Sequence, residues 1–362
     1  MSIWETIKNI QGIFIKLFTN IQSILIIIVG IYERVIPMAK NYNWACIGCG
    51  HIADEMAKAM NKLNKTFYSL ASRTKANADA FALKYSIDKV YDNIDDVFSD
   101  ENVDIIYIAT PHNSHIEYIL KALNSGKHVL CEKAITLNSN ELKQAVETAE
   151  KNNVVLAEAM TIFHMPVYRK IDEVISSGKL GKLKLIQVNL GSCKDYDMTN
   201  RFFNMELAGG AMLDIGVYAL SFARYFMTEN PAEIESQMKK VPTGADEQVN
   251  IILKNTENEM ATVTLSLTAK LPKIGIAAFE NGYVEVSNYN RAFSASITYT
   301  DDEHTEYIET TTDLDALCYE IIDMENAVSG NENNMHLDYT IDVMDIMTKV
   351  RFAHDMKYPE EL

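Results

Sequence analysis

Hydrophobic and polar positions follow two different rhythms along the chain. From Trp44 to about residue 160, short apolar runs alternate with segments whose apolar residues recur at helical spacing, such as Ile52, Met56 and Met60. Strands separated by helices predict repeated βαβ units and a parallel sheet. The predicted strands are Trp44–Ile47, Phe67–Ala71, Val103–Ala109, His128–Cys131 and Val154–Ala157, and further predicted helices are Ala76–Tyr85, Ile116–Leu123 and Glu141–Ala149.

After Pro166 the rhythm changes. One helix and one strand lead into a long apolar helix, and several alternating strands then follow without helices between them. This pattern predicts an α+β domain with an open, mostly antiparallel sheet, and we expect the last helix to pack back onto the first domain. The predicted elements are helices Val167–Ser176, Ala211–Phe226, Leu314–Val328 and Leu337–Phe352, and strands Leu183–Asn189, Val249–Leu253, Ala261–Leu267, Gly282–Val286 and Ser294–Tyr299.

These rhythms divide the chain into an N-terminal extension (1–40), a first domain (41–160) and a second domain (161–362). The extension fits neither rhythm. Its most apolar stretch, Ile21–Tyr32, is about a dozen residues long, whereas a membrane span needs about twenty. We favour Met38 as the native start, with residues 1–37 outside the fold. An interfacial helix or weak signal anchor in residues 1–37 stays open as the alternative.

Composition narrows the classes of function. The 362 residues are 48% hydrophobic and 23% charged, as in a folded globular protein with room for two domains. The net charge of −17 and the lack of a Lys/Arg cluster argue against a nucleic-acid partner. No His/Cys/Asp/Glu spacing suggests a metal site. The five cysteines are irregularly spaced, which fits reduced thiols in the cytoplasm.

A glycine motif follows the first predicted strand. Gly48-Cys49-Gly50-His51-Ile52-Ala53 fits G-x-G-x-x-A between a strand and a helix. The glycines permit a tight turn and close approach of a pyrophosphate, and the helix N-terminus supplies unpaired N–H groups. Cys46 and Cys49 also form a C-x-x-C, a redox or zinc pattern, but Cys46 falls in an apolar strand. The sequence therefore predicts dinucleotide binding by residues 48–52 of a doubly wound Rossmann domain, namely Gly48, Cys49, Gly50, His51 and Ile52.

The end of the second predicted strand bears on the choice of cofactor. An NAD enzyme often places an acid here for the ribose 2′-hydroxyl, whereas this chain has Ser72 and Arg73. A guanidinium suits a 2′-phosphate because its planar fork binds phosphate oxygens. The pair favours NADP(H) and leaves NAD(H) open, and a solvated surface arginine is the alternative interpretation of Arg73.

Further motifs follow the later strands and open the long helix. They are Thr110-Pro111-His112-Asn113-Ser114-His115, Val129-Leu130-Cys131-Glu132-Lys133 and Ala208-Gly209-Gly210-Ala211-Met212-Leu213-Asp214-Ile215-Gly216-Val217-Tyr218. With the glycine motif and the Ser-Arg pair, they resemble the Gfo/Idh/MocA oxidoreductases, most closely the branch of dimeric dihydrodiol dehydrogenase and its bacterial relatives. The resemblance runs from about Trp44 to Phe352.

The resemblance implies catalytic roles for Lys133, Asp214 and Tyr218. In the family the lysine of a Glu-Lys-Pro motif lies beside the nicotinamide and the substrate hydroxyl. The proline is Ala134 here, which makes the cis bond found in some relatives costlier and puts the loop geometry in question. Asp214 and Tyr218 lie four residues apart, so that a helix would put them on one face. They match the Asp-x-x-x-Tyr form of the family's acid/base pair.

Other residues are candidates for binding. The resemblance implies that Thr110, Pro111, His112, His115 and Glu132 line the cofactor site, although a helix N-terminal role fits the two histidines as well. His164 lies where the family often has an arginine and aromatic residues near the substrate.

The first functional hypothesis is an enzyme that moves a hydride between nicotinamide and a hydroxyl or carbonyl carbon of a sugar, cyclitol or cyclic diol. Tyr218 would exchange the hydroxyl proton, and the Lys133 ammonium should favour its phenolate. The second hypothesis is a dinucleotide-binding regulator of the same fold without turnover. The resemblance also implies a homodimer, or a higher even oligomer, through the open sheet of the second domain.

Overall fold

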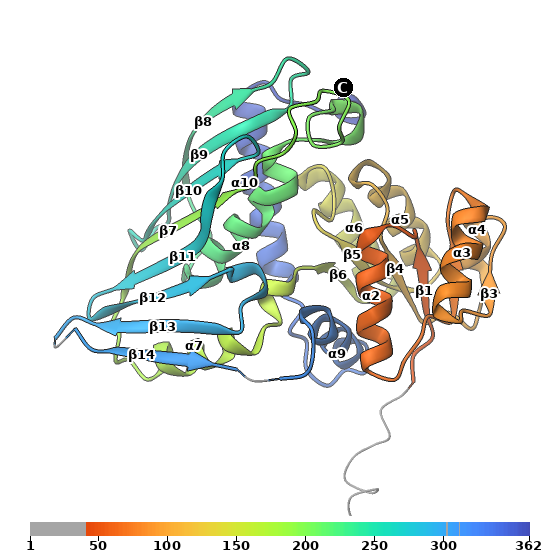
Figure 1. The fold of residues 1–362 in the computed structure, drawn as a ribbon, viewed down its shortest axis with the longest axis horizontal. Helices are drawn as coiled ribbons and strands as arrows, with labels where there is room; N and C mark the ends of the chain where they lie inside the picture. Colours follow the sequence, from red (N-terminus) through yellow and green to blue (C-terminus); the bar gives the residue numbers. More distant parts are fainter. Residues whose placement is uncertain (1–40, 302, 311) are drawn as a thin grey trace, which may run out of the picture. The chain divides into compact units, whose positions relative to one another are not determined.

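The computed structural model describes residues 41–301, 303–310 and 312–362. Residues Asn43–Leu362 form one compact unit, which Figure 1 shows as a ribbon. The interpretations of residues 1–37, as a late start or a membrane-associating helix, lie outside the described residues.

The first sheet is parallel in every pairing. Its strand order is β3-β2-β1-β4-β5-β6, the doubly wound order in which the chain reverses direction beside β1. Every residue of β1 and β4 is buried, as expected for strands covered on both faces. The strands are β1 (Trp44–Ile47), β2 (Ser69–Ala71), β3 (Lys89–Val90), β4 (Ile105–Ile108), β5 (His128–Glu132) and β6 (Leu156–Ala159).

Helices connect these strands and bury one apolar side each. In the first of them, the buried side is formed by Ala53, Met56, Ala57, Ala59 and Met60. The helix Ser139–Asn152 begins after Asn138, whose side chain accepts hydrogen bonds from two backbone N–H groups as a typical N-cap. The helices are α2 (His51–Lys62), α3 (Lys75–Tyr85), α4 (Asp95–Ser99), α5 (His115–Asn124) and α6 (Ser139–Asn152).

The second sheet is mixed but mostly antiparallel, as the sequence predicts. Its order is β14-β13-β12-β11-β7-β10-β9-β8, and only β7 and β10 pair in parallel. The strands are β7 (Leu183–Gly191), β8 (Glu233–Lys240), β9 (Asp246–Lys254), β10 (Met260–Ser266), β11 (Leu271–Phe279), β12 (Gly282–Ser287), β13 (Ser294–Tyr299) and β14 (Thr305–Glu309).

Helices α8 and α10 lie along one face of this second sheet (Figure 1). The last helix also contacts α6 and β6, so the prediction that it packs back onto the first half is confirmed. The second half contains α7 (Pro166–Ser176), α8 (Val217–Phe226), α9 (Ala316–Val328) and α10 (Leu337–Ala353). Among the described residues, only the segment Met205–Phe226 is long and apolar enough to span a membrane, and 72% of its apolar window is buried inside the protein.

Several elements escape the hydrophobic pattern for identifiable reasons. The edge strand β8 alternates between exposed and half-buried residues and contains four charged side chains in EIESQMKK. The central strand β11 contains Pro272 and three small residues, and a side chain at Gly275 would collide with the ring of Phe222. Strand β6 is shifted two residues from its predicted position. Small or charged residues replace the β-branched residues that usually mark a strand.

Candidate active site

The turn between β1 and α2 has the geometry that its glycine motif predicts. Gly48 has φ +109°, and a Cβ there would lie 2.4 Å from the Ala109 carbonyl oxygen at the end of β4. Only glycine tolerates both constraints. At Gly50 a Cβ would meet nothing within 4 Å, and no side chain caps the N-terminus of α2. The turn therefore leaves open space in front of the first backbone N–H groups of the helix.

The two cysteines of the C-x-x-C do not form a pair. Cys46 is fully buried, burial raises the pKa of its thiol, and its sulfur hydrogen-bonds to the Gly48 carbonyl oxygen. The Cys49 thiol instead donates to Ser72 Oγ at 3.3 Å. All five cysteines are free thiols. Cys49 thus links the glycine turn to the end of β2, beside the exposed side chain of Arg73.

Some of the residues after β4 line a cavity, and another joins the loops beside it. Thr110, Pro111 and His112 line a cavity beside the glycine turn. His112 Nε2 lies 3.1 Å from the Lys133 carbonyl oxygen, and burial, followed by the charges of His115 and Lys133, lowers its pKa to about 3. His115 is fully buried, with ring nitrogens 2.8 Å from the Thr110 oxygen and 3.1 Å from the Ala134 oxygen. His115 is therefore not among the residues that line the cavity; it is the first residue of α5, and its ring joins the loops after β4 and β5.

The loop after β5 brings Lys133 into the cavity. The preceding residue, Glu132, also lines it and accepts a hydrogen bond from the buried Tyr107 hydroxyl. Burial raises the pKa of Glu132, although the Tyr107 hydrogen bond works against this shift. The Lys133–Ala134 bond is cis even though no proline follows. Alanine in place of the family's proline therefore leaves this loop in the cis form.

Asp214 and Tyr218 reach the same cavity from the helix of residues 211–226. The first part of this helix is a wide π-helical turn, η4 (Met212–Gly216), which continues into α8. The sequence predicts a regular α-helix here, so the π-turn is a local departure of a kind common at functional sites. The packing beneath the turn is tight, because a Cβ at Gly216 would lie 2.9 Å from the side chain of Leu265.

Lys133, Asp214 and Tyr218 form a compact group. Lys133 Nζ donates to the Asp214 carbonyl oxygen at 2.7 Å, lies 3.5 Å from Asp214 Oδ1, and lies 4.8 Å from the centre of the Tyr218 ring. Burial works to lower the pKa of Lys133, but Tyr218 and Asp214 outweigh it and raise that pKa overall. Burial likewise works to raise the pKa of Asp214, and Lys133 and Arg201 outweigh it, so that pKa is lowered. The lysine and the aspartate are therefore both charged.

The pKa of the Tyr218 hydroxyl differs from what the neighbouring lysine alone would give. Burial raises the pKa of its hydroxyl, and the Lys133 ammonium only partly opposes that shift. The hydroxyl is therefore protonated at neutral pH, and the prediction that Lys133 favours the phenolate is wrong for the site without substrate. A protonated phenol beside an ammonium is arranged to give up a proton when an acceptor oxygen arrives.

The cavity that these residues share measures about 380 Å³. Gly50, Ile52 and Ala109 contribute from the first half, together with the residues after β4 and β5. Arg201 and Leu207 also line it, and neither was predicted from the sequence. Both lie in the loop between β7 and helix 211–226, which contains no recognisable motif. Arg201 reaches within 3.6 Å of Asp214 Oδ1 and lies over the ring of Phe202.

His164, predicted to lie near the substrate, is not among the residues that line this cavity. It is fully buried, and its Nδ1 lies 2.8 Å from Asp323 Oδ2 on α9. Arg169 of α7 donates to the same carboxylate at 3.2 Å. His164 therefore joins the turn before α7 to α9 in the interior. An apolar sequence context around one histidine does not distinguish an interior hydrogen bond from a substrate contact.

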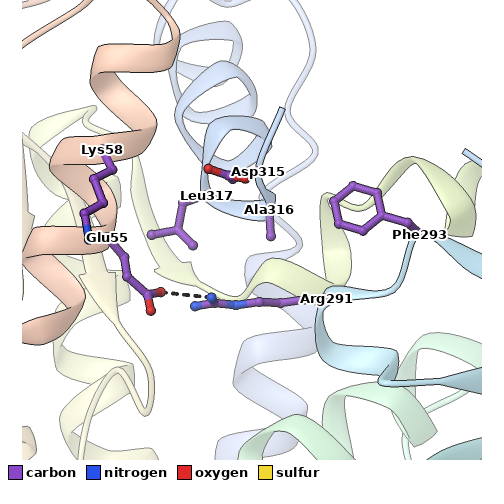
Figure 2. A pocket seen from close by; sticks show the side chains of 7 residues that line it. All are labelled: Glu55, Lys58, Arg291, Phe293, Asp315, Ala316 and Leu317. Atoms are coloured by element: carbon purple, nitrogen blue, oxygen red, sulfur yellow. Dashed lines mark ion pairs between the residues drawn. The ribbon is translucent and has the colours of Figure 1, made fainter. Parts of the chain in front are cut away.

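Figure 2 shows a second cavity, of about 260 Å³, between α2 and the second half of the chain. Arg291 of the short helix η5 (Tyr289–Arg291) extends toward Glu55 of α2, and the two charged groups meet at 2.9 Å. Lys58 pairs with Asp54 on the same helix. Since these charged groups already have partners, we interpret this cavity as part of the contact that joins α2 to the second half.

A doubly wound parallel sheet with an uncapped glycine turn at its central strand is typical of a dinucleotide-binding Rossmann domain. The chain belongs to the Gfo/Idh/MocA family. The family model described as "Oxidoreductase family, NAD-binding Rossmann fold" matches residues 42–160, and the model of the GFO/IDH/MocA C-terminal domain matches residues 168–286. Among the described residues, no group of three or more His, Cys, Asp or Glu side chains could hold a metal ion.

Relatives include trans-1,2-dihydrobenzene-1,2-diol dehydrogenase from Danio rerio, which is 29% identical over 247 residues, covering 67% of this chain and 73% of the relative. The Mus musculus enzyme of the same name is 28% identical over 67% of this chain and 74% of its own length. The fold is similar to a 3-ketoreductase from Actinomadura kijaniata in complex with NADP and TDP-benzene (TM-score 0.76, 20% identity, 86% of this chain and 98% of that chain). It is also similar to an aldose-aldose oxidoreductase from Caulobacter crescentus (TM-score 0.79, 18% identity, 87% and 98%). The family and its named relatives make the chain a dehydrogenase or reductase.

Proposed function

We propose that the protein transfers a hydride between NADP(H) and a hydroxyl or carbonyl carbon of a sugar, a cyclitol or a cyclic diol. The observation that carries the proposal is the meeting of Lys133, Asp214 and Tyr218 in one cavity beside the glycine turn. The named relatives act on a diol and on sugars, which supports this range of substrates.

The residues of the first half fit a dinucleotide. The open space at Gly50 and the uncapped start of α2 suit a pyrophosphate, held by Gly48, Cys49, Gly50, His51 and Ile52. Ser72 and Arg73 would contact the 2′-phosphate of NADP(H). Arg73 is exposed and makes no hydrogen bond or ion pair with another described residue, so it is free to do so. Thr110, Pro111, His112, Glu132 and Lys133 border the space for the nicotinamide, which supplies or accepts the hydride when bound.

The proton accompanies the hydride through Tyr218. In the direction of reduction, its hydroxyl donates a proton to the substrate oxygen, and in oxidation the phenolate takes that proton back. Lys133 polarises the same oxygen and stabilises the phenolate, because its ammonium lies over the tyrosine ring. Asp214 holds Lys133 in place through its carbonyl oxygen and its carboxylate. Neutral His112 fixes the Lys133 backbone and adds no charge to the site.

A turnover assay tests this function. NADPH and NADH oxidation is followed with a panel of ketoses, aldoses and inososes, and NADP⁺ and NAD⁺ reduction with polyols and trans-1,2-dihydrobenzene-1,2-diol. We expect turnover of at least one substrate class, and its loss in Lys133→Met. Lys143→Met is the matched control, since that lysine is exposed on α6. Tight NADPH binding without turnover of any member would instead favour the non-catalytic regulator.

Two further properties belong to the same proposal. The open face of the second sheet suits pairing with a second copy of the chain, as a homodimer or a higher even oligomer. The five free thiols suit a reducing compartment such as the cytoplasm.

A further inference from the structure

The turn after α10 contacts the start of helix 211–226. Tyr358 is fully buried, and its hydroxyl donates a hydrogen bond of 2.9 Å to the Gly209 carbonyl oxygen. Gly209 itself is enclosed, since a Cβ there would lie 2.5 Å from the Arg201 carbonyl oxygen. Tyr358 therefore bonds the backbone at the point where the loop that contains Arg201 turns into the helix that contains Asp214 and Tyr218.

The same turn is held to the first half of the chain by Glu361. Its carboxylate accepts two hydrogen bonds from the buried Arg351 of α10, each 2.8 Å, and one of 2.8 Å from the Tyr358 backbone N–H. It also accepts a 2.9 Å bond from Asn138, which caps α6 shortly after Lys133 in the chain. Burial works to raise the pKa of Glu361, but Arg351 outweighs it, and the carboxylate stays charged.

A third contact reaches the loop after β4. Asn113, which follows the cavity residue His112, donates to Glu360 at 2.8 Å and to the Glu206 carbonyl oxygen at 3.3 Å. The backbone loop around Glu206 leads directly to Gly209. Residues Tyr358–Glu361, here called the clasp, thus touch both halves of the chain where they meet at the candidate active site.

We propose that the clasp is a positioning element for hydride transfer, with Tyr358 setting where helix 211–226 begins. The helix carries Asp214 and Tyr218, whereas Lys133 and the nicotinamide-lining residues come from the first half, so the distance between them depends on what joins the halves at this point. Neither Tyr358 nor Glu361 lines the cavity, and both act through other residues. The expected effect on kcat rests on the proposed function, whereas the expected effect on amide hydrogen exchange does not.

Tyr358→Phe tests the clasp in the full chain, because it keeps the buried ring and removes only the hydroxyl. Amide hydrogen exchange needs no substrate. Peptides within residues 209–218 should exchange about tenfold faster, the factor expected for one lost buried hydrogen bond. Peptides from β9 and β10 should not change. Tyr307→Phe, at an exposed position of β14, is the matched control and should change neither region.

The kinetic arm measures kcat and the KM for NADPH with the substrate that the panel identifies. Tyr358→Phe should lower kcat by about tenfold and leave the KM for NADPH unchanged, since the glycine turn is untouched. In a Tyr218→Phe background the same substitution should cost nothing further, because it acts through Tyr218. Glu361→Gln should reproduce the direction of both effects if Tyr358→Phe folds poorly.

A lower melting temperature with unchanged exchange at residues 209–218 and unchanged kcat would overturn the proposal and leave the clasp a structural contact only. The proposed function is tested separately by wild-type turnover and by Tyr218→Phe. The clasp can therefore fail while the function stands. If the function fails, the exchange result still decides whether the clasp positions the helix.

Discussion

At the scale of single residues, burial and charge compete at Tyr218. Burial is the largest cause that raises the pKa of the phenol, and the Lys133 ammonium lowers it without reversing the shift. A substrate oxygen placed between the two groups would be near both an ammonium and a phenol that still holds its proton. This arrangement suits proton donation in reduction. The reverse reaction needs the phenolate, which the same ammonium stabilises.

Arg73 is the residue that decides between cofactors in this account. Arg73→Ala should weaken NADPH binding by about 2 kcal/mol, the size of a charge-assisted pair with a phosphate, and leave NADH binding almost unchanged. Fluorescence titration of the bound nicotinamide with both cofactors measures this. Equal loss for NADPH and NADH would mean that Arg73 is a solvated surface arginine.

Cavity residues that belong to a sequence motif could be predicted, whereas cavity residues in loops without a motif could not. Lys133, Asp214 and Tyr218 could be proposed from the sequence because each lies in a short motif next to a predicted strand or helix, and the structure places the three side chains together. Arg201 lines the same cavity from a loop without any signature, so only its position in space reveals it. The contact between His164 and Asp323 could not be predicted either, because the two residues are distant in the chain.

At the scale of elements, the start of helix 211–226 is set by neighbouring segments. The Asp246 carboxylate at the start of β9 accepts a 2.7 Å hydrogen bond from the Met212 N–H, and thus caps the helix from another strand. Burial raises the pKa of Asp246 to about 6, against the pull of that hydrogen bond. Gly210, with φ +132°, makes room for this carboxylate, because a Cβ there would lie 2.0 Å from Asp246 Oδ1.

Gly210→Ala should therefore distort the helix start. We expect a loss of about 2 kcal/mol or more in the free energy of unfolding, from the collision added to the unfavourable φ, together with a fall in kcat. Gly126→Ala is the matched control, because Gly126 has φ +71° but open space around its Cβ position. The control should lose only about 1 kcal/mol and keep its activity. Denaturant unfolding measures both, and equal losses would show that Asp246 does not constrain Gly210.

Most strands and helices of the first half were predictable because the longer strands are apolar runs between helices, but the two-residue strand β3 and the short helix α4 were missed because neither is long enough to show a hydrophobic pattern. The second half was predicted less completely. Strand β11 is small-residue-rich because the ring of Phe222 occupies the space above Gly275, and that contact is tertiary. Strand β8 is an edge strand with charged residues, a composition that protects an exposed edge and hides the strand from a hydrophobic pattern.

At the scale of the whole molecule, the open face of the second sheet has an apolar stripe that follows its strand register. Met260 of β10 is opposite Leu185 of β7, which is opposite Ala278 of β11, which is opposite Tyr283 of β12. Three of these side chains are large and more than a third exposed. An exposed apolar stripe across several strands suits association with a second copy.

We therefore expect a dimer or higher even oligomer by light scattering at micromolar concentration. Leu185→Glu should shift it toward the monomer, because it places a charge in the middle of the stripe. Leu83→Glu, at an 86% exposed position on α3, is the matched control and should leave the mass unchanged. A wild-type monomer at that concentration would contradict the proposed interface.

The two halves of the chain meet around three interacting residues, with Lys133 from the first half and Asp214 and Tyr218 from the second. We propose that these three residues move the proton that accompanies the hydride. Tyr218→Phe keeps the ring over which Lys133 lies and deletes only that proton. Tyr225→Phe is the matched control, because Tyr225 lies on the same helix but outside the cavity, and its hydroxyl donates a hydrogen bond to Asp172.

The decisive measurement is single-turnover kinetics of NADPH oxidation by Tyr218→Phe beside NADPH affinity. We expect normal NADPH binding with a hydride-transfer rate about a hundredfold or more below wild type, within the range for loss of a general acid. Tyr225→Phe should keep a rate close to wild type. Normal binding with a near-wild-type rate in Tyr218→Phe would contradict the account and make Tyr218 a packing residue.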